Sequence, residues 1–357
     1  MFWSNIASST SHNFRVVLKK NEERTYRVFV KPVEKGTLDW RFMYSNTVDS
    51  TFDNGSVSRA NLSGGNFRIL WAKAGTADTD RNLLCEKPVT WNGEAPYDVK
   101  PNEVFTSDPV KLTVSEGEYL AFTWRLMGLD DETVIPSTPD SRLITFEGDK
   151  ELVQSCGYDT PMPDMFAADR SCEKKMVFIG DSITQGCGTP VDTLEQWAAR
   201  IGMGIDRRIG VWNIGLGFGR ASDAASDGAW LKKAAQADIV NVCFGVNDIL
   251  QSYMNGDAVV YHLRRIVRCL KKRNPEVRVI LFTVPPFDMQ GVNETTWRYV
   301  QRAIREDGLG SDKVFDIAKI IGQPEPMDNM AFFGSHPDGR GGAAVCGEYL
   351  SRIYEML

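Results

Sequence analysis

Two short segments in the second half of the sequence carry side chains that could perform acyl transfer. An apolar run at residues 176–179 leads directly into Gly-Asp-Ser at 180–182, which places the hydroxyl of Ser182 in a tight turn between a strand and a helix. Residues 334–338 carry His336, the only histidine expected in a loop just ahead of a helix. A serine nucleophile and a histidine that takes its proton are the pair that covalent ester hydrolysis requires.

Two further segments offer hydrogen-bond donors for the negative charge that develops on a carbonyl oxygen during such a reaction. The glycines of residues 215–219 let the backbone approach a ligand closely and aim N–H groups at it. Residues 245–248, Gly-Val-Asn-Asp, add the side-chain amide of Asn247. Nucleophile, base and donors together predict acyl transfer, a reaction for which this residue set needs neither a metal nor an organic cofactor.

The elements that must position these segments alternate between strands and amphipathic helices after Cys172. The expected strands are 176–179, 211–214, 239–244, 277–283 and 314–317, and the expected helices are 194–207, 229–237, one between Asp257 and Pro275, 295–305 and 341–354. This alternation predicts a three-layer α/β domain with a parallel sheet covered on both faces. Ligands of such sheets bind beyond the carboxyl ends of the strands, where the chemical segments fall.

The first part of the chain follows a different pattern. Residues 13–148 alternate in short apolar and polar runs broken by turn residues, which predicts an N-terminal β-sandwich, jelly-roll-like in its connections. Residues 148–171 show no clear period and contain glycine and prolines. We therefore expect a sandwich domain over 1–150, a linker over 151–172 and the α/β domain over 173–357.

The four segments, in this order, resemble the sequence blocks of the SGNH (GDSL) hydrolase superfamily of esterases, lipases and deacetylases. The resemblance covers about residues 175–357 and implies that Ser182 is the nucleophile and His336 the general base and then acid. It also implies an oxyanion hole formed by the Ser182 N–H, a glycine N–H and the Asn247 side chain. Gly219 matches that glycine best, although its spacing from the preceding strand is one residue longer than in the family, and Gly217 is the alternative.

The sequence departs from the family at the acid of the catalytic triad. Family members carry an aspartate three residues before the histidine, where this chain has Phe333. Asp338 lies two residues after the histidine and Asp328 eight before it, so neither is a direct substitute. We expect a Ser-His dyad in which a backbone carbonyl or another side chain accepts the Nδ1 proton. Asp338 is then a turn residue ahead of Gly339.

The domain order and the missing aspartate are similar to the family 2 carbohydrate esterases, which pair a β-sandwich with an SGNH domain. That similarity implies that aromatic side chains of the sandwich could stack on sugar rings, although we expect Trp40, Trp71, Trp91 and Trp124 each to pack in the core or on a sheet. We expect Asp181 to brace its turn without a chemical step. Arg220 is a candidate for contact with the polar end of a substrate, against the simpler expectation of an exposed arginine at a helix start.

The function expected from the resemblance is a serine esterase that removes O-acyl groups, preferably O-acetyl, from carbohydrate such as an imported plant-polysaccharide oligomer. Two alternatives stay open. One is a lipid esterase or acyl thioesterase, and the other is a carbohydrate-binding protein whose hydrolase domain has lost its activity, a reading that Phe333 motivates. The sequence leaves open whether the protein forms an oligomer. It also leaves open whether the sandwich binds substrate, forms a subunit interface or shields the cleft.

Composition excludes several other classes of protein. The 357 residues carry 41 Lys and Arg against 47 Asp and Glu, a net charge of −6 without the basic surface that nucleic acid or anionic membranes require. The longest apolar run, at 279–286, is too short to cross a bilayer. The N-terminus lacks the pattern of a secretory signal, and seven scattered cysteines indicate reduced thiols. We therefore expect a cytoplasmic protein without a structural metal site.

Overall fold

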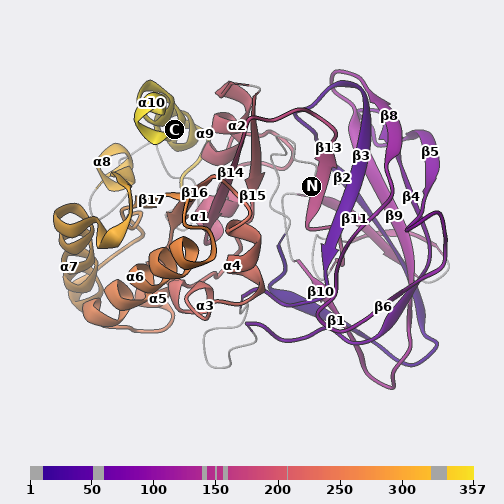
Figure 1. The fold of residues 1–357 in the computed structure, drawn as a ribbon, viewed down its shortest axis with the longest axis horizontal. Coiled ribbons are helices and arrows are strands. Elements are labelled where there is room, and N and C mark those ends of the chain that lie inside the picture. The colour runs from indigo at the N-terminus through magenta and orange to yellow at the C-terminus, as the bar shows by residue number, and fades with distance from the viewer. Residues whose placement is uncertain are drawn as a thin grey trace.

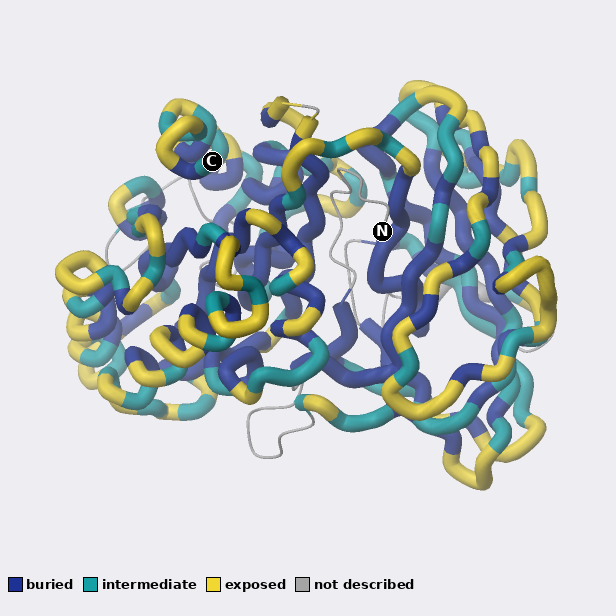
Figure 2. The backbone as a smooth tube through the Cα atoms, viewed as in Figure 1, coloured by how far each residue is buried: buried dark blue, intermediate teal, exposed yellow. Residues whose placement is uncertain are grey.

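A computed structural model describes residues 11–50, 60–138, 143–148, 151–155, 160–206, 208–322 and 336–357. A strand-rich N-terminal half and an α/β C-terminal half lie side by side (Figure 1). Buried backbone runs through the strands of both halves, whereas the outer loops and outer helix faces are exposed (Figure 2). The predicted division into an antiparallel strand-rich region and a parallel-sheet domain is confirmed.

The N-terminal half consists of antiparallel sheets. One sheet has the order β12-β11-β2-β9-β4-β5 with β6 on β4, a second has the order β13-β3-β7 with β8 on β3, and β1 pairs with β10. The strands are β1 (Phe14–Leu18), β2 (Glu23–Val30), β3 (Gly36–Ser45), β4 (Phe67–Ala77), β5 (Leu83–Val89), β6 (Tyr97–Val99), β7 (Val104–Thr106), β8 (Val110–Val114), β9 (Tyr119–Gly128), β10 (Thr133–Ser137), β11 (Ile144–Gly148), β12 (Val153–Ser155) and β13 (Met165–Ala168). The jelly-roll order of connections stays a prediction.

An aromatic core lies between the two larger sheets. Trp40, Phe42 and Tyr44 of β3 meet Phe122 and Trp124 of β9, and the rings of Phe42 and Phe122 have their centroids 4.7 Å apart. Each large aromatic side chain buries a large apolar area, so a few of them stabilise a sandwich that is built from short strands. The strands therefore hold together through this core as well as through their backbone ladders.

Residues 151–172, which we expected to form a linker, instead add two strands to the sandwich. β12 pairs with β11 at one end of the first sheet, and β13 pairs with β3 in the second. The side chains of β13 alternate between two cores: Phe166 and Ala168 pack inside the sandwich, while Met165 and Ala167 pack in the core of the C-terminal half. A strand buried on both faces shows no polar alternation, so its sequence carries no period of two.

The C-terminal half is a five-stranded parallel sheet of order β15-β14-β16-β17-β18. Its strands are β14 (Lys174–Gly180), β15 (Ile209–Asn213), β16 (Ile239–Cys243), β17 (Arg278–Phe282) and β18 (Lys313–Phe315). Its helices are α1 (Ser182–Gln185), α2 (Trp197–Gly204), α3 (Ala221–Ala224), α4 (Ala229–Ala234), α5 (Val246–Leu250), α6 (Gly256–Arg273), α7 (Gly291–Asp307), the 3-10 turn η1 (Gly308–Gly310), α8 (Ile317–Ile321), α9 (Gly339–Ser351) and α10 (Ile353–Met356). Asn255, not the expected Asp257, caps α6.

Alternate residues of β14 divide between two cores, which defines three layers. Val177 and Ile179 pack with α4, α6 and α7, whereas Met176 and Phe178 pack with α2 and α9 on the opposite face of the sheet. Parallel strands covered on both faces carry apolar side chains on both, as β14 does from Met176 to Ile179. No helix in the described part of the chain is long and apolar enough to span a membrane.

Candidate active site

Ser182 and His336 meet at the carboxyl end of β14. The strand ends at Gly180, and Asp181 caps α1 by accepting a hydrogen bond from the N–H of Ile183 over 3.0 Å. This turn places the Oγ of Ser182 2.8 Å from the Nε2 of His336, although 154 residues separate them in the chain. The distance is that of a direct hydrogen bond, so the imidazole can take the hydroxyl proton as the serine attacks.

Two neighbours hold the imidazole in place. Gly188 has φ +97°, and a Cβ added to it would lie 2.8 Å from the Cβ of His336, so only glycine permits this approach of the two loops. Phe287, in the loop after β17, packs its ring edge-on against the imidazole, with the ring centroids 4.7 Å apart. The loop after α1 and the loop after β17 therefore both contact the histidine.

Candidate donors for an oxyanion are the Ser182 N–H and the side-chain amide of Asn247. The backbone N–H of Ser182 lies at the first position of α1, where no intrahelical acceptor exists, and it forms no hydrogen bond within the described chain. Asn247, at the start of α5, donates one hydrogen of its amide to the carbonyl of Gly219 over 3.0 Å. The amide nitrogen carries two hydrogens, so this bond orients the side chain and leaves the second hydrogen for a substrate oxygen.

The glycine loop that follows β15 is a tight turn. The N–H of Gly219 donates to the carbonyl of Leu216 over 3.0 Å, so this predicted oxyanion donor is already engaged in the turn. Phe218 within the turn has φ +58°, a left-handed conformation that costs free energy for a residue with a side chain. Gly217 presents an N–H that makes no hydrogen bond with the described residues, and its carbonyl accepts one from Asn13. Both glycines therefore stay candidates.

Two buried aspartates support the site. Asp248 accepts hydrogen bonds from the N–H groups of Ala221 and Ser222 over 2.7 and 3.1 Å, which ties α5 to the start of α3. Burial raises the pKa of Asp248 to about 6 and that of Asp181 to about 7, because an apolar environment disfavours the charged carboxylate. Both carboxyls act as backbone acceptors, and neither contacts the Ser182 hydroxyl.

Two other predicted residues serve neighbouring helices. Asp338 caps α9, accepting from the N–H groups of Arg340 and Gly341, and its Oδ2 accepts from the Arg340 guanidinium over 2.7 Å. These bonds aim its carboxylate at its own helix, and Asp338 does not orient His336. Arg220, expected to be exposed, is only 7% exposed because its guanidinium donates to the carboxylate of Asp223 and to Ser252.

The remaining predictions divide between the sandwich core and the undescribed residues. Trp40, Trp91 and Trp124 are buried in the sandwich core, as expected, whereas Trp71 is 36% exposed with the Lys73 ammonium 5.7 Å from its ring centroid. Asp328 and Phe333, on which the question of the triad acid depends, lie outside the described residues.

A buried polar cluster lies between the two halves, and the sequence pointed to none of its members. It contains His12, Asp49 and Asp164 of the N-terminal half and Lys233 of α4, whose ammonium lies 2.5 Å from one oxygen of each carboxylate. Lysine and aspartate are almost never fully buried unless paired, so local sequence predicts an exposed position for each. Only the packing of the two halves brings them together.

Residues 178–344 match the GDSL-like Lipase/Acylhydrolase family. A lipolytic protein of the G-D-S-L family from Veillonella parvula is 20% identical, covers 51% of this chain and 99% of its own, and has a TM-score of 0.44. A family two carbohydrate esterase from Clostridium thermocellum, in complex with cellohexaose, is 14% identical, covers 99% of this chain and 98% of its own, and has a TM-score of 0.45. Another from Cellvibrio japonicus is also 14% identical, covers 98% of this chain and 96% of its own, and has a TM-score of 0.40.

No curated protein matches the sequence. Residues 178–344, just under half of the chain, thus resemble a GDSL-like lipase/acylhydrolase domain.

Proposed function

We propose that this protein is a serine esterase that removes O-acyl groups, preferably acetyl groups, from carbohydrate. The observation that carries the proposal is the 2.8 Å contact between Ser182 Oγ and His336 Nε2 inside a domain that matches the GDSL-like family. A hydroxyl placed this close to an imidazole, in a turn with open N–H donors, is suited to attack an ester carbonyl.

The reaction proceeds through an acyl-enzyme. Ser182 attacks the ester carbonyl while His336 takes its proton, and the carbonyl oxygen becomes an oxyanion held by the Ser182 N–H and the free amide hydrogen of Asn247. A glycine N–H of the loop 215–219 is the third donor. His336 then protonates the leaving sugar oxygen, and water repeats the sequence with the acyl-enzyme to release the carboxylic acid and free Ser182.

A cavity beside the histidine is large enough for a leaving group of the size of a sugar. It has a volume of about 780 Å³ and adjoins His336 through Gly188. Four charged side chains, Glu195, Arg200, Asp338 and Arg340, stand among its lining residues. These charged groups can pair with sugar hydroxyls. The lining also exposes apolar surface, so the choice between a sugar and a lipid is left to the substrate test below.

The first test is acetate release from acetylated xylo- and manno-oligosaccharides and from an activated acetyl ester. We expect release by the wild-type protein and at least a thousandfold loss in Ser182→Ala, because the nucleophile is gone. A fluorophosphonate should label the wild type at Ser182 and leave Ser182→Ala unlabelled. Absence of both release and labelling would refute the esterase and favour the inactive carbohydrate-binding protein. Labelling together with release from long-chain esters alone would favour the lipid esterase.

We also propose a cytoplasmic location. The six described cysteines are free thiols, which suits a reducing compartment. Fractionation of the producing cells under thiol-trapping conditions tests this, and recovery in an extracellular fraction would refute it.

A further inference from the structure

We propose that Asn13 of the N-terminal half is a positioning residue for the active site, because it holds the glycine loop that supplies one of the three oxyanion donors. The inference rests on the proposed function. It gives the sandwich a role in the esterase reaction itself, where the sequence left open whether this half binds substrate, forms an interface or shields the cleft.

The contact is direct and buried. The side-chain amide of Asn13, which is 1% exposed, donates to the carbonyl of Gly217 over 2.7 Å. That carbonyl belongs to the peptide that joins Gly217 to Phe218, the residue with φ +58°. A strained backbone conformation persists only where surrounding contacts hold it in place. The hydrogen bond from Asn13 is such a contact, because rotation of the peptide between Gly217 and Phe218 would break it.

Asn13 is itself anchored by its neighbours. Its N–H donates a hydrogen bond to the carbonyl of Ser137. The preceding residue, His12, makes two hydrogen bonds with Asp49: the N–H of His12 donates to the Asp49 carboxylate over 3.0 Å, and the N–H of Asp49 donates to the His12 carbonyl over 2.7 Å. His12 Nε2 lies 3.0 Å from the carbonyl of Met162. These bonds fix the segment before it reaches the glycine loop.

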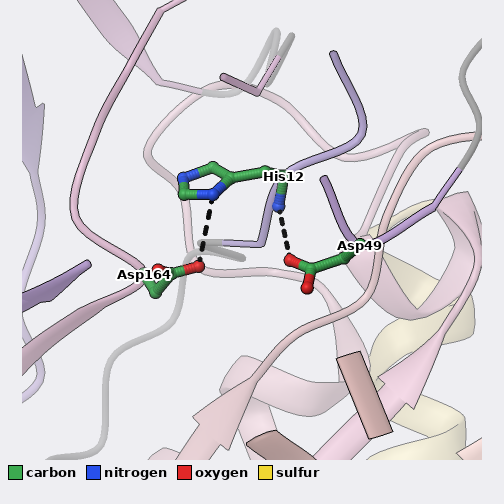
Figure 3. A group of neighbouring side chains, drawn as sticks. All are labelled: His12, Asp49 and Asp164. Carbon is green, nitrogen blue, oxygen red and sulfur yellow. Dashed lines mark hydrogen bonds and ion pairs between the residues drawn. The ribbon is translucent and has the colours of Figure 1, made fainter. Parts of the chain in front are cut away.

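The segment that carries Asn13 is linked to the hydrolase half through an ion-pair cluster. Figure 3 shows His12 between Asp49 and Asp164, with its Nδ1 3.5 Å from the Asp164 carboxylate. Lys233 of α4 binds both carboxylates over 2.5 Å. His12, Asp49 and Asp164 are close enough to share a metal ion, but the Lys233 ammonium already supplies the positive charge that the carboxylates need. The cluster is therefore an ion-pair anchor between the two halves.

A second contact restrains the other end of the loop. Ser50, next to Asp49, donates its hydroxyl to the carboxylate of Asp223 over 2.8 Å. Asp223 pairs in turn with Arg220, which directly follows Gly219. The N-terminal half therefore holds the glycine loop on both flanks, at Gly217 through Asn13 and at Arg220 through Ser50 and Asp223.

The test compares Asn13→Leu, which keeps the side-chain size without the donor, with Asn61→Leu. Asn61 also donates from the N-terminal half to the hydrolase half, to Ser226 over 2.7 Å, but it does not touch the glycine loop. We expect kcat for the activated acetyl ester to fall at least tenfold in Asn13→Leu with KM changed less than twofold, and kcat to be unchanged in Asn61→Leu. A donor misplaced by loop motion weakens binding of the transition state rather than of the substrate.

A second measurement does not depend on catalysis. Amide hydrogen exchange of the peptide covering 214–221 should be at least fivefold faster in Asn13→Leu than in Asn61→Leu.

Unchanged kcat and unchanged exchange in a folded Asn13→Leu protein would overturn the inference, as would equal losses of kcat in both variants. If Asn13→Leu does not fold, Asn13→Asp, which also removes the donor, replaces it. If the wild-type protein lacks esterase activity, the proposed function fails, and the exchange comparison alone decides the positioning role.

Discussion

Phe287 lies edge-on against the imidazole of His336, with 4.7 Å between the ring centroids and 88° between the ring planes. This packing restrains the ring whose Nε2 faces Ser182. The SGNH sequences that this chain resembles carry an aspartate where it has Phe333, and we propose that the contact with Phe287 supplies part of the orientation that the acid would give.

We therefore expect Phe287→Ala to lower kcat about tenfold with little change in KM, because the imidazole samples orientations in which it cannot take the serine proton. Steady-state hydrolysis of an activated acetyl ester measures both constants. Phe287→Tyr, which keeps the ring, should retain most of the activity. Equal activity in the alanine and tyrosine variants would show that the contact does not orient the base.

Removal of the Asn247 amide should cost more. We expect Asn247→Ala to lower kcat by about 10² to 10³ with KM nearly unchanged, because the oxyanion loses one donor and the Gly219 carbonyl loses its partner. Asn255→Ala is the matched control: it removes the N-cap of α6 and should lower the free energy of unfolding by about 1 kcal/mol while leaving kcat unchanged. A loss below fivefold in Asn247→Ala would remove Asn247 from the oxyanion hole.

Asp181 should make the protein less stable as the pH rises. Its pKa of about 7 in the folded protein lies above the ordinary aspartate value of 3.8, so between about pH 4 and 7 the folded state holds a proton that the unfolded state has lost. The free energy of unfolding therefore falls as the pH rises through this range, by up to about 4 kcal/mol from this group. Asp248, with its pKa raised to about 6, adds a smaller effect of the same sign.

Asp181→Asn keeps a side-chain oxygen for the N–H of Ile183 and cannot ionise. Urea unfolding at pH 5 and pH 8 should show a smaller drop in the free energy of unfolding for this variant than for the wild type. Parallel pH curves for the two proteins would contradict the raised pKa of Asp181.

Loss of Lys233 should destabilise the junction between the halves. Burial alone would lower the pKa of the Lys233 ammonium, but its two carboxylate partners outweigh that effect and raise it. Burial raises the pKa of Asp49, because it disfavours the charged carboxylate. Lys233→Met leaves two buried carboxylates without a cation and should cost about 3 to 5 kcal/mol in urea unfolding. The triple variant Lys233→Met, Asp49→Asn, Asp164→Asn should recover much of that loss. A cost below 1 kcal/mol for the single variant would disprove the anchoring role.

The sequence by itself determined the α/β domain and the edge of its sheet at which the candidate site lies. The strand 174–180 is apolar from Met176 onwards, and the helix of residues 256–273 has one apolar face. Such local patterns follow directly from burial on one or both sides. Ser182 follows β14, Asn247 follows β16, and His336 lies shortly before α9. A parallel sheet brings the carboxyl ends of its strands to one edge, so their meeting could be predicted without coordinates.

Only the tertiary structure decided how the two halves join. β13 is buried on both faces and therefore showed no period, and Lys233 is buried because Asp49 and Asp164, 184 and 69 residues away, neutralise it. Asn13 reaches Gly217 across 204 residues. Polar side chains are buried only when a partner is present, and nothing in a local sequence window reveals a partner that distant segments supply.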